Sequence, residues 1–337
     1  MNKIPVSVGL DYAFAVVQVC VVDGQGRILR NRKCENQWQA IAGQVKPDER
    51  VEVAVIEACA GAADLADELV GKGHWPVQLA LPGVVKRMKS NPDKHDWGDA
   101  HMLADLGRVK YVPRVWLAPA PVRDLRMLVR YRQQLVNQRR AAKLRIGAIV
   151  REQRVQIPAR RWSKPWRAAL AECKDFSEQG RWVIEQHLGA LLHLNGEIAR
   201  AEERMAQGAE QDWKVRELLA FKGIGLVTAC VMRAEIGSFE RFKSAKSLAR
   251  FCALTPRNAS SGLRQADAGV IQAGNHSLRS VLIEAAHRLA RFEPRWKAMA
   301  QAMRARGKPG SVVAVAIANR WMRTLYHPVV AKERAAA

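Results

Sequence analysis

Two kinds of hydrophobic pattern divide this chain, with short Val-rich runs in the first hundred residues and long helical periodicities after them. Residues 6–11 and 14–22 are apolar runs separated by a short polar break, and a turn rich in Gly at 23–26 leads to a further run at 27–32. Apolar runs bounded by turn residues predict two or three antiparallel strands.

Strand and helix signals then alternate up to about residue 107. Strands are expected at 51–57 and 76–81, and helices at 36–45, 62–70, 83–89 and 96–107. This β-β-β-α-β-α-β-α order differs from the strict alternation of a Rossmann domain. It predicts a separate α/β domain over residues 1–118.

The middle of the chain, residues 119–212, is expected to form two long helices, at 121–157 and 176–205, with a turn around Pro158 and Pro165. An antiparallel hairpin within one chain and a coiled coil between chains both satisfy the pattern, so a dimer or tetramer is one expectation. The apolar residues of the second helix fall at coiled-coil spacing: Ile184, Leu188, Leu191, Ile198 and Met205.

Residues 213–337 are expected to form a third, mostly helical domain. A Gly-Ile-Gly turn interrupts the helical stretch at 218–234, a loop rich in Asn, Ser and Gly occupies 255–275, and helices are expected at 276–292 and 311–325. The predicted fold class is therefore α/β plus α.

The charge of the chain points to its partner. Its 337 residues carry 55 Lys and Arg against 32 Asp and Glu, a net charge of +23. Residues 123–167 hold 14 basic residues and two acids, so +12 of that charge lies in one segment. A solubilising helix face is the ordinary explanation, but solubility rarely needs so one-sided a segment. A nucleic-acid partner is favoured.

Other features indicate the compartment. No stretch without Asp, Glu, Lys or Arg exceeds 13 residues, too short to span a bilayer. The apolar run at 12–22 lacks the flanks of a signal peptide. Six cysteines show no C-x-x-C pairing, which is typical of free thiols in a reducing cytosol. A cytoplasmic protein without a membrane partner is expected.

Four carboxylates in the first domain stand where catalysis would place them. Asp11 closes the first strand, Glu57 closes a central apolar strand, and Asp96 and Asp99 share one face at a helix start. A carboxylate among Val and Ile is costly unless it is paired or binds a cation. Four converging carboxylates would hold two Mg²⁺ ions for phosphodiester chemistry. Together they favour an RNase H/RuvC-like nuclease domain.

Each acid also has an ordinary structural interpretation. Asp11 can cap a turn, Glu57 can pair with an arginine, and Asp96 and Asp99 can be first-turn helix acids. Asp93 and Asp105 are further acids that could replace members of the set. An actin-like sugar kinase also begins with a strand and an Asp, but no Gly-rich phosphate loop is present.

Seven short motifs occur along the chain in a recognisable order: Gly9-Leu10-Asp11, Glu57-Ala58-Cys59-Ala60-Gly61, Asp96-Trp97-Gly98-Asp99-Ala100, Gly223-Ile224-Gly225, Ala234-Glu235-Ile236-Gly237, Ser260-Ser261-Gly262 and Gly274-Asn275. Over nearly the whole chain, they resemble one known family, the DEDD transposases of the insertion-sequence IS110 family, including its IS1111 branch. In two places the sequence departs from that pattern: His95 stands where the family usually has Thr, and Lys222 where it often has Pro.

The resemblance implies a DNA recombinase that excises and inserts its own element. It implies a bridge RNA that pairs with donor and target DNA, and a C-terminal serine that forms a covalent phosphoserine link with DNA. Ser261 matches that position best, with Ser260 as the alternative. Asp11, Glu57, Asp96 and Asp99 would hold the Mg²⁺ ions. The expected nucleic-acid contacts are Lys222, Gly223, Gly225, Arg264, Asn275, Arg279, and Arg139, Arg140 and Lys143 on the basic helix.

From the residues alone, the Gly223-Ile224-Gly225 turn is either a phosphate-binding helix-hairpin-helix turn or a plain connection between helices. Two other functions also fit the sequence. A metal-dependent endonuclease of the Holliday-junction type would use water instead of serine, and a covalent protein–DNA adduct separates the two. The other is a non-catalytic nucleic-acid-binding protein whose acids are structural. Loss of DNA breakage in Asp11→Ala or Glu57→Ala with binding retained would argue against it, and normal cutting by these variants would exclude the proposed active site.

Overall fold

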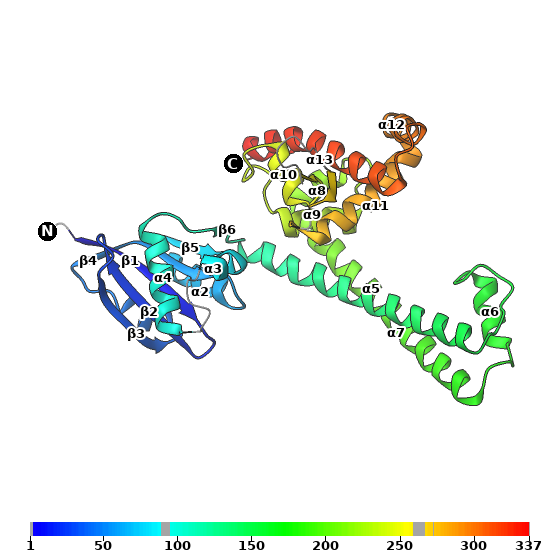
Figure 1. Cartoon of the computed structure of the whole chain (residues 1–337), viewed down its shortest axis with the longest axis horizontal. Coiled ribbons are helices and arrows are strands. Elements are labelled where there is room, and N and C mark those ends of the chain that lie inside the picture. The colour runs from blue at the N-terminus through cyan, green and yellow to red at the C-terminus, as the bar shows by residue number, and fades with distance from the viewer. Residues whose placement is uncertain (1–2, 89–94, 259–266, 272, 337) are drawn as a thin grey trace. The chain divides into compact units, whose positions relative to one another are not determined.

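A computed structural model of the chain describes residues 3–88, 95–258, 267–271 and 273–336 (Figure 1). The chain divides into two compact units, Met1–Pro119 and Ala120–Ala337. The first unit is a mixed α/β sheet with helices, and the second is mostly helical. The boundary expected near residue 212 falls inside the second unit, so a separate middle domain stays a prediction.

The first unit is built on a six-stranded sheet in the order β3-β2-β1-β4-β5-β6. β1 pairs antiparallel with β2 and parallel with β4. The predicted strands are all present, whereas β6 was missed because two residues carry no pattern. The strands are β1 (Ile4–Tyr12), β2 (Val16–Asp23), β3 (Ile28–Glu35), β4 (Glu49–Glu57), β5 (Val77–Ala80) and β6 (Arg114–Val115).

Helices cover both faces of this sheet. Leu65 and Leu69 of α2 pack with Leu10 and other β1 and β4 residues on one face. Ala100 and Ala104 of α4 pack with Cys20 and Val22 of β2 on the other. Because successive strand residues point to opposite faces, each strand supplies both layers. The helices are α1 (Trp38–Ala42), α2 (Ala62–Gly71), α3 (Pro82–Met88) and α4 (Asp96–Arg108).

The second unit begins with two long helices, α5 (Ala120–Glu152) and α7 (Glu178–Gln211), which pack antiparallel. Arg132 of α5 pairs with Glu202 at 2.6 Å, and Arg139 Nη1 donates to Asn195 Oδ1 at 3.1 Å. The predicted apolar seam of α7 thus faces α5 of the same chain, as an intramolecular hairpin. The connection, for which the sequence predicts a turn, contains the short helix α6 (Lys164–Glu172). Ser163 caps this helix, and Pro165 lies in its first turn, where proline is favourable.

The remaining helices form one apolar core around α9, α11 and α13. The expected loop at 255–275 contains a small antiparallel pair, β7 and β8, whose strands flank residues outside the described part. The elements are α8 (Trp213–Leu219), α9 (Leu226–Ile236), α10 (Ala245–Phe251), β7 (Pro256–Asn258), β8 (Asp267–Val270), α11 (His276–Phe292), α12 (Pro294–Ala305) and α13 (Gly310–Ala335).

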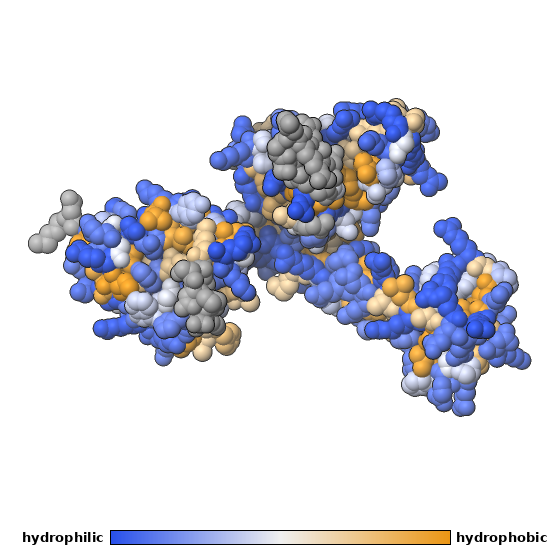
Figure 2. All heavy atoms as spheres, viewed as in Figure 1, coloured by the Kyte–Doolittle hydropathy of each residue, from blue (hydrophilic) through white to orange (hydrophobic). Residues whose placement is uncertain are grey.

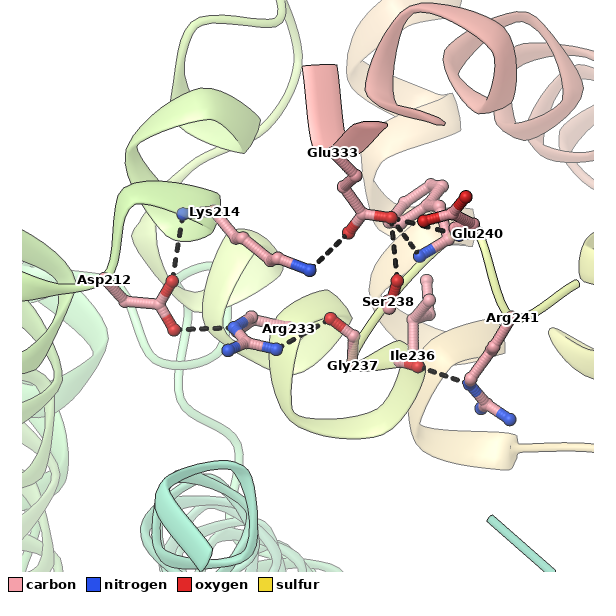
Figure 3. A network of polar contacts seen from close by, with 10 residues as sticks. Asp212, Lys214, Arg233, Ile236, Gly237, Ser238, Glu240, Arg241 and Glu333 are labelled. Carbon is pink, nitrogen blue, oxygen red and sulfur yellow. Dashed lines mark hydrogen bonds and ion pairs between the residues drawn. The ribbon is translucent and has the colours of Figure 1, made fainter. Parts of the chain in front are cut away.

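The buried carboxylate of Glu333 links the last helix, α13, to this core through hydrogen bonds (Figure 3). Glu333 of α13 is 5% exposed and accepts from Lys214 Nζ at 2.9 Å, Ser238 Oγ at 2.8 Å, and the backbone N–H groups of Phe239 at 2.9 Å and Glu240 at 3.0 Å. Beside it, Arg233 Nε donates to Asp212 at 2.6 Å. These contacts join α8, α13 and the loop after α9.

The six cysteines are free thiols. Within the described ranges, no helix combines the length and the apolar character needed to cross a membrane.

Candidate active site and nucleic-acid interface

Asp11 and Glu57 lie at the same end of two neighbouring parallel strands. Leu10 of β1 is in register with Ile56 of β4, so the next residues of the two strands, Asp11 and Glu57, stand side by side. Both side chains are partly exposed. The carboxyl ends of parallel strands meet at one edge of a sheet, and this edge carries the first two predicted acids.

Both carboxylates lie on the face of the sheet that α4 covers. A β-carbon at Gly9 would stand 2.0 Å from the carbonyl oxygen of Ala100, so the Gly9 side of β1 faces α4. A β-carbon at Gly107 would likewise stand 2.9 Å from Val55 Cγ2. Side chains two residues apart in a strand share a face, so Asp11 follows Gly9 and Glu57 follows Val55.

The direction of α4 brings its own acids to the same end. Gly107 lies over Val53 and Val55, while Ala100 lies over Gly9, so the helix runs opposite to β1. Its first turn, with Asp96 and Asp99, therefore reaches the level at which β1 and β4 end. Asp96 and Asp99 precede the buried Ala100 and Leu103 by four residues each, which places them on the helix face nearest the sheet.

The start of α4 is held by polar contacts that the sequence did not reveal. Lys33 Nζ of β3 forms an ion pair with Asp96 at 2.9 Å. Asn31 Nδ2 donates to the carbonyl oxygen of Trp97 at 3.0 Å, and Gln18 Nε2 donates to Asn31 Oδ1 at 2.6 Å. Gln18 is 6% exposed, and a glutamine within the Val-rich run of β2 was the available signal for this network.

His95 takes the place of the usual threonine as the helix cap. Its Nδ1 accepts a hydrogen bond from the backbone N–H of Gly98 at 3.3 Å, in the position where a Thr hydroxyl acts as N-cap. The departure from the family pattern thus preserves the capping function. Asp105 lies more than two turns further along α4 and pairs with Arg108 at 2.7 Å, away from this end, while Asp93 lies outside the described residues.

Carboxylate oxygens are the ligands that Mg²⁺ prefers. The four acids are therefore suitable ligands for a divalent ion, and their elements bring them to the same end of the sheet. Among the described residues, however, no three His, Cys, Asp or Glu side chains are close enough together to hold one ion. The ion pair of Asp96 with Lys33 is one reason, because it draws this carboxylate toward β3.

The thiol of Cys59 lies close to the first two acids. Burial raises the pKa of this thiol, and the carboxylates of Glu57 and Asp11 raise it further. A thiol kept neutral in this way is a weak nucleophile.

The Gly223 turn connects α8 and α9. Gly223 has a φ of +87°, and a β-carbon there would stand 2.9 Å from Leu289 Cδ2, so glycine is required both by the backbone and by the packing. Gly225 is exposed at the N-cap of α9, where no side chain caps the helix. Its first N–H groups can receive a phosphate. Lys222 is 82% exposed in its side chain and pairs with Glu293 at 3.4 Å.

Asn275, one of the predicted DNA contacts, has its side-chain amide committed within the protein. Its Oδ1 accepts from Leu278 N at 3.0 Å as the cap of α11, and its Nδ2 donates to Glu235 Oε2 at 2.7 Å. Arg279 Nη1 donates to the carbonyl oxygen of Ile271 at 3.4 Å. The placement favours a positioning role for Asn275. Ser260, Ser261 and Arg264 lie outside the described residues.

The three basic residues expected on the long helix differ in exposure. Arg140 is exposed, Arg139 donates to Asn195, and Lys143 Nζ lies 5.0 Å from the centre of the Trp162 ring. Burial lowers the pKa of Lys143, and Arg139 and Arg167 lower it further. Hydrophilic residues cover much of the visible face of α5 and α7 (Figure 2).

Comparisons with known proteins match both parts of the chain. The DEDD_Tnp_IS110 family, described as "Transposase", matches residues 8–153, and the "Transposase IS116/IS110/IS902 family" matches residues 215–301. The first match includes all four acids. The second includes the Gly223 turn and both candidate serines.

Relatives with curated names agree with these matches. A protein of Pseudomonas aeruginosa named "Probable family 20 transposase" is 29% identical over 338 residues, covering 95% of each chain. The "Transposase for insertion sequence element IS1111A" of Coxiella burnetii is 28% identical over 84% of this chain and 77% of its own length. The "Transposase for insertion sequence element IS1328" of Yersinia enterocolitica is 25% identical over 80% of this chain and 81% of its own.

Proposed function

The chain belongs to the IS110/IS116 family of insertion-sequence transposases, and on that premise we propose that it cuts and rejoins DNA under the guidance of a bridge RNA, with Mg²⁺ at its four acids and a C-terminal serine as nucleophile. The observation that carries the proposal is the shared placement of Asp11, Glu57 and the first turn of α4 at one end of the sheet. In support, all four acids also fall within residues 8–153, which match a DEDD transposase family.

The sheet supports an RNase H/RuvC-like assignment for the first unit. β1 lies centrally, antiparallel to β2 and parallel to β4, and β5 continues the parallel side. The proposed catalytic acids occupy the ends of β1 and β4 and the start of α4. A fold of this kind carries its acids on separate elements, so bringing them together around an ion would depend on the packing of α4 against the sheet.

Asp11, Glu57, Asp96 and Asp99 would hold the divalent ions, expected to be two Mg²⁺. When bound, such ions activate an attacking oxygen and stabilise the leaving oxygen of a phosphodiester. The residues of this chain supply the ligands and their positions. Gly9 lets α4 approach β1, Asn31 and His95 fix the first turn of α4, and Asp96 must exchange Lys33 for the ion.

Ser261 is the proposed nucleophile and Ser260 the alternative, on the basis of the family resemblance. The hydroxyl oxygen of the serine attacks a DNA phosphorus and its proton passes to a base. The new O–P bond replaces the bond from phosphorus to a deoxyribose oxygen, which leaves as a hydroxyl after taking up a proton. The energy of the broken bond is retained in the phosphoserine link, so a second hydroxyl can rejoin the strand.

The basic long helix suits the RNA and DNA backbones. Phosphate contacts position a nucleic acid without reading its sequence, and base pairing with the guide RNA would supply the sequence recognition. Assembly into a dimer or tetramer is supported by large apolar side chains on the helical hairpin that are more than half exposed, at Leu144, Trp182 and Leu192. Such side chains on an otherwise polar surface are typical of interaction sites.

The test uses plasmid DNA with the flanks of the gene, RNA transcribed from those flanks, purified protein and Mg²⁺. Labelled DNA that remains attached to the protein on a denaturing gel demonstrates the covalent link. Ser261→Ala is expected to abolish this adduct, and Asp99→Asn to abolish both cutting and adduct. Asp105→Asn is the matched control, because it removes a carboxylate from the other end of the same helix.

The outcomes separate the candidate functions. An adduct that survives Ser261→Ala moves the nucleophile to Ser260 or to another residue. Cutting that needs Mg²⁺ but leaves no adduct indicates an endonuclease that uses water. Nucleic-acid binding without any cutting, unchanged by Asp99→Asn, indicates a non-catalytic binding protein.

A further inference from the structure

A groove of about 440 Å³ on the first half of α5 is lined by three arginines. Arg123, Arg126 and Arg130 are spaced by three and four residues, so they share one face of the helix. None of them belongs to the proposed contact set of the long helix. Met127, Tyr131 and Gln134 complete the lining.

A buried carboxylate sets the position of two of these guanidinium groups. Glu235 of α9 is 5% exposed. Arg130 Nε donates to Oε1 at 3.1 Å and its Nη2 to Oε2 at 3.3 Å, while Arg126 Nε lies 3.8 Å from Oε2 and donates to the carbonyl oxygen of Ala234 at 3.0 Å. Arg126 and Arg130 are therefore held in position before any ligand binds.

Arg126 and Arg130 share one carboxylate. Both guanidinium groups lie within 4 Å of Glu235, so these three side chains together keep one positive charge. Burial lowers the pKa of Arg126, Glu235 raises it, and Arg130 and Arg123 lower it further. A phosphate in the groove would offset the mutual repulsion of these guanidinium groups.

Arginine favours a particular anion. A guanidinium group forms charge-assisted hydrogen bonds with phosphate oxygens. The N–H groups that Arg126 and Arg130 do not use for Ala234 and Glu235 can do so with little loss of side-chain entropy. A phosphodiester also suits an open groove along a helix, since successive phosphates can continue beyond it toward the rest of α5.

Glu235 also contacts the start of α11. Asn275 Nδ2 donates to the same Glu235 at 2.7 Å, and the backbone N–H of Asn275 donates to the carbonyl oxygen of Phe251 at 2.8 Å. Asn275 is the N-cap of α11. Glu235 thus joins Arg126 and Arg130 of α5 to the N-terminus of α11.

We propose that Arg123, Arg126 and Arg130 form a phosphate-binding site for a nucleic-acid strand, with Arg126 and Arg130 positioned by Glu235 beside the N-terminus of α11. The inference rests on the proposed function only in taking the anion to be a phosphodiester. DNA and RNA offer the same group, and the experiment tells them apart.

The experiment measures binding of two fluorescein-labelled 20-mers, a duplex DNA and a single-stranded RNA, by anisotropy over a range of salt concentrations. The test variant is Arg123→Gln/Arg130→Gln in the full chain, which leaves the half-buried Arg126 in place. The matched control is Arg304→Gln/Arg306→Gln, which removes the same charge from the exposed surface of α12 in the same unit. Thermal unfolding of each variant shows that it is folded.

Loss of two phosphate contacts is expected to make the plot of log affinity against log salt shallower by about 1.8 for duplex DNA, or about 1.4 for single-stranded RNA. The control should keep the wild-type slope, and the probe whose slope changes identifies the strand. A test variant whose slope equals that of the control for both probes overturns the proposal.

This result is independent of cleavage. A changed salt dependence in the test variant supports the phosphate-binding site even if the wild-type protein forms no adduct with DNA. In that case the proposed function is contradicted and the phosphate-binding site is not. If the adduct forms and the slope does not change, the groove fails and the proposed function stands.

Discussion

Gly9 and Ala100 touch through their backbones: a β-carbon at position 9 would stand 2.0 Å from the Ala100 carbonyl oxygen and 2.4 Å from the Ala104 nitrogen. This contact sets the distance between β1 and α4, and thus between Asp11 and the acids of α4. Gly9→Ala is expected to push the helix away, at a cost of roughly 3 kcal/mol or more in the free energy of unfolding, and to abolish cleavage.

Gly71→Ala is the matched control, because nothing lies within 4 Å of a β-carbon there. It should leave both properties close to wild type. Urea unfolding and the DNA-cutting assay check the pair. A Gly9→Ala protein with wild-type stability and cleavage would show that the approach of α4 is not required for the site.

The Lys33–Asp96 ion pair is expected to compete with a divalent ion. In Lys33→Met, Asp96 loses its ammonium partner, so the Mg²⁺ or Mn²⁺ concentration that half-saturates the protein should fall several-fold, as read by calorimetry or by the metal-dependent rise in melting temperature. Lys72→Met is the control. It breaks the Lys72–Glu68 pair, whose side chains are 56% and 43% exposed against 59% and 42% for Lys33 and Asp96.

Exposed pairs of this kind contribute about 1 kcal/mol or less to stability. Both variants should therefore unfold close to wild type without metal, so that a change in metal affinity is not a folding effect. Equal metal affinity in Lys33→Met and Lys72→Met would exclude Asp96 as a ligand, or exclude Lys33 as its competitor.

Glu333 is expected to stabilise the second unit through its four donors. Glu333→Ala leaves the Lys214 ammonium and two backbone N–H groups without their acceptor, which costs roughly 3 to 5 kcal/mol. Arg334→Ala is the neighbouring control, since it removes only an exposed pair with Glu240 at 3.0 Å and should cost less than about 1 kcal/mol. Denaturant unfolding measures both, and similar losses in the two variants would contradict this role.

The elements of the first unit follow from the sequence because their signals are local. Val-rich runs, turn residues and helix caps predict each strand and helix from β1 to α4, and the placement of Asp11 and Glu57 at strand ends is visible in the same runs. The direction of α4 is not local. It depends on Gly9 and Gly107, whose missing side chains give no signal in a single sequence.

The polar contacts around the site could not be predicted from the sequence either. Lys33 and Asp96 are 63 residues apart, and Arg130 and Glu235 are 105 apart, so neither pair has a spacing to recognise. The family resemblance singled out Glu235 and Asn275 but gave no physical reason for these residues. The structure supplies one, since together they join α9, α11 and the arginines of α5. Ser261 rests on the resemblance alone.

The burial of three cysteines predicts how many thiols of the native protein react with a thiol reagent. Burial raises the pKa of Cys20, Cys230 and Cys252 to about 12, whereas Cys34, Cys59 and Cys173 are partly or fully exposed. A thiol with a pKa near 12 is almost entirely protonated at pH 8, and the protonated thiol does not react. A thiol reagent at pH 8 should therefore modify at most three cysteines in the native protein and six after denaturation, as counted by mass spectrometry.

The same pKa shift makes stability depend on pH. The unfolded thiol ionises near pH 9 and the folded one near pH 12, so the contribution to stability is complete below pH 9 and is lost as the pH rises toward 12. Each buried thiol adds about 1.4 kcal/mol per pH unit to this loss. Cys252→Ala will be less stable at pH 8 because it leaves a cavity, but its stability should fall less steeply between pH 9 and 10.5 than that of wild type. Parallel curves for the two proteins would show that Cys252 does not titrate differently on folding.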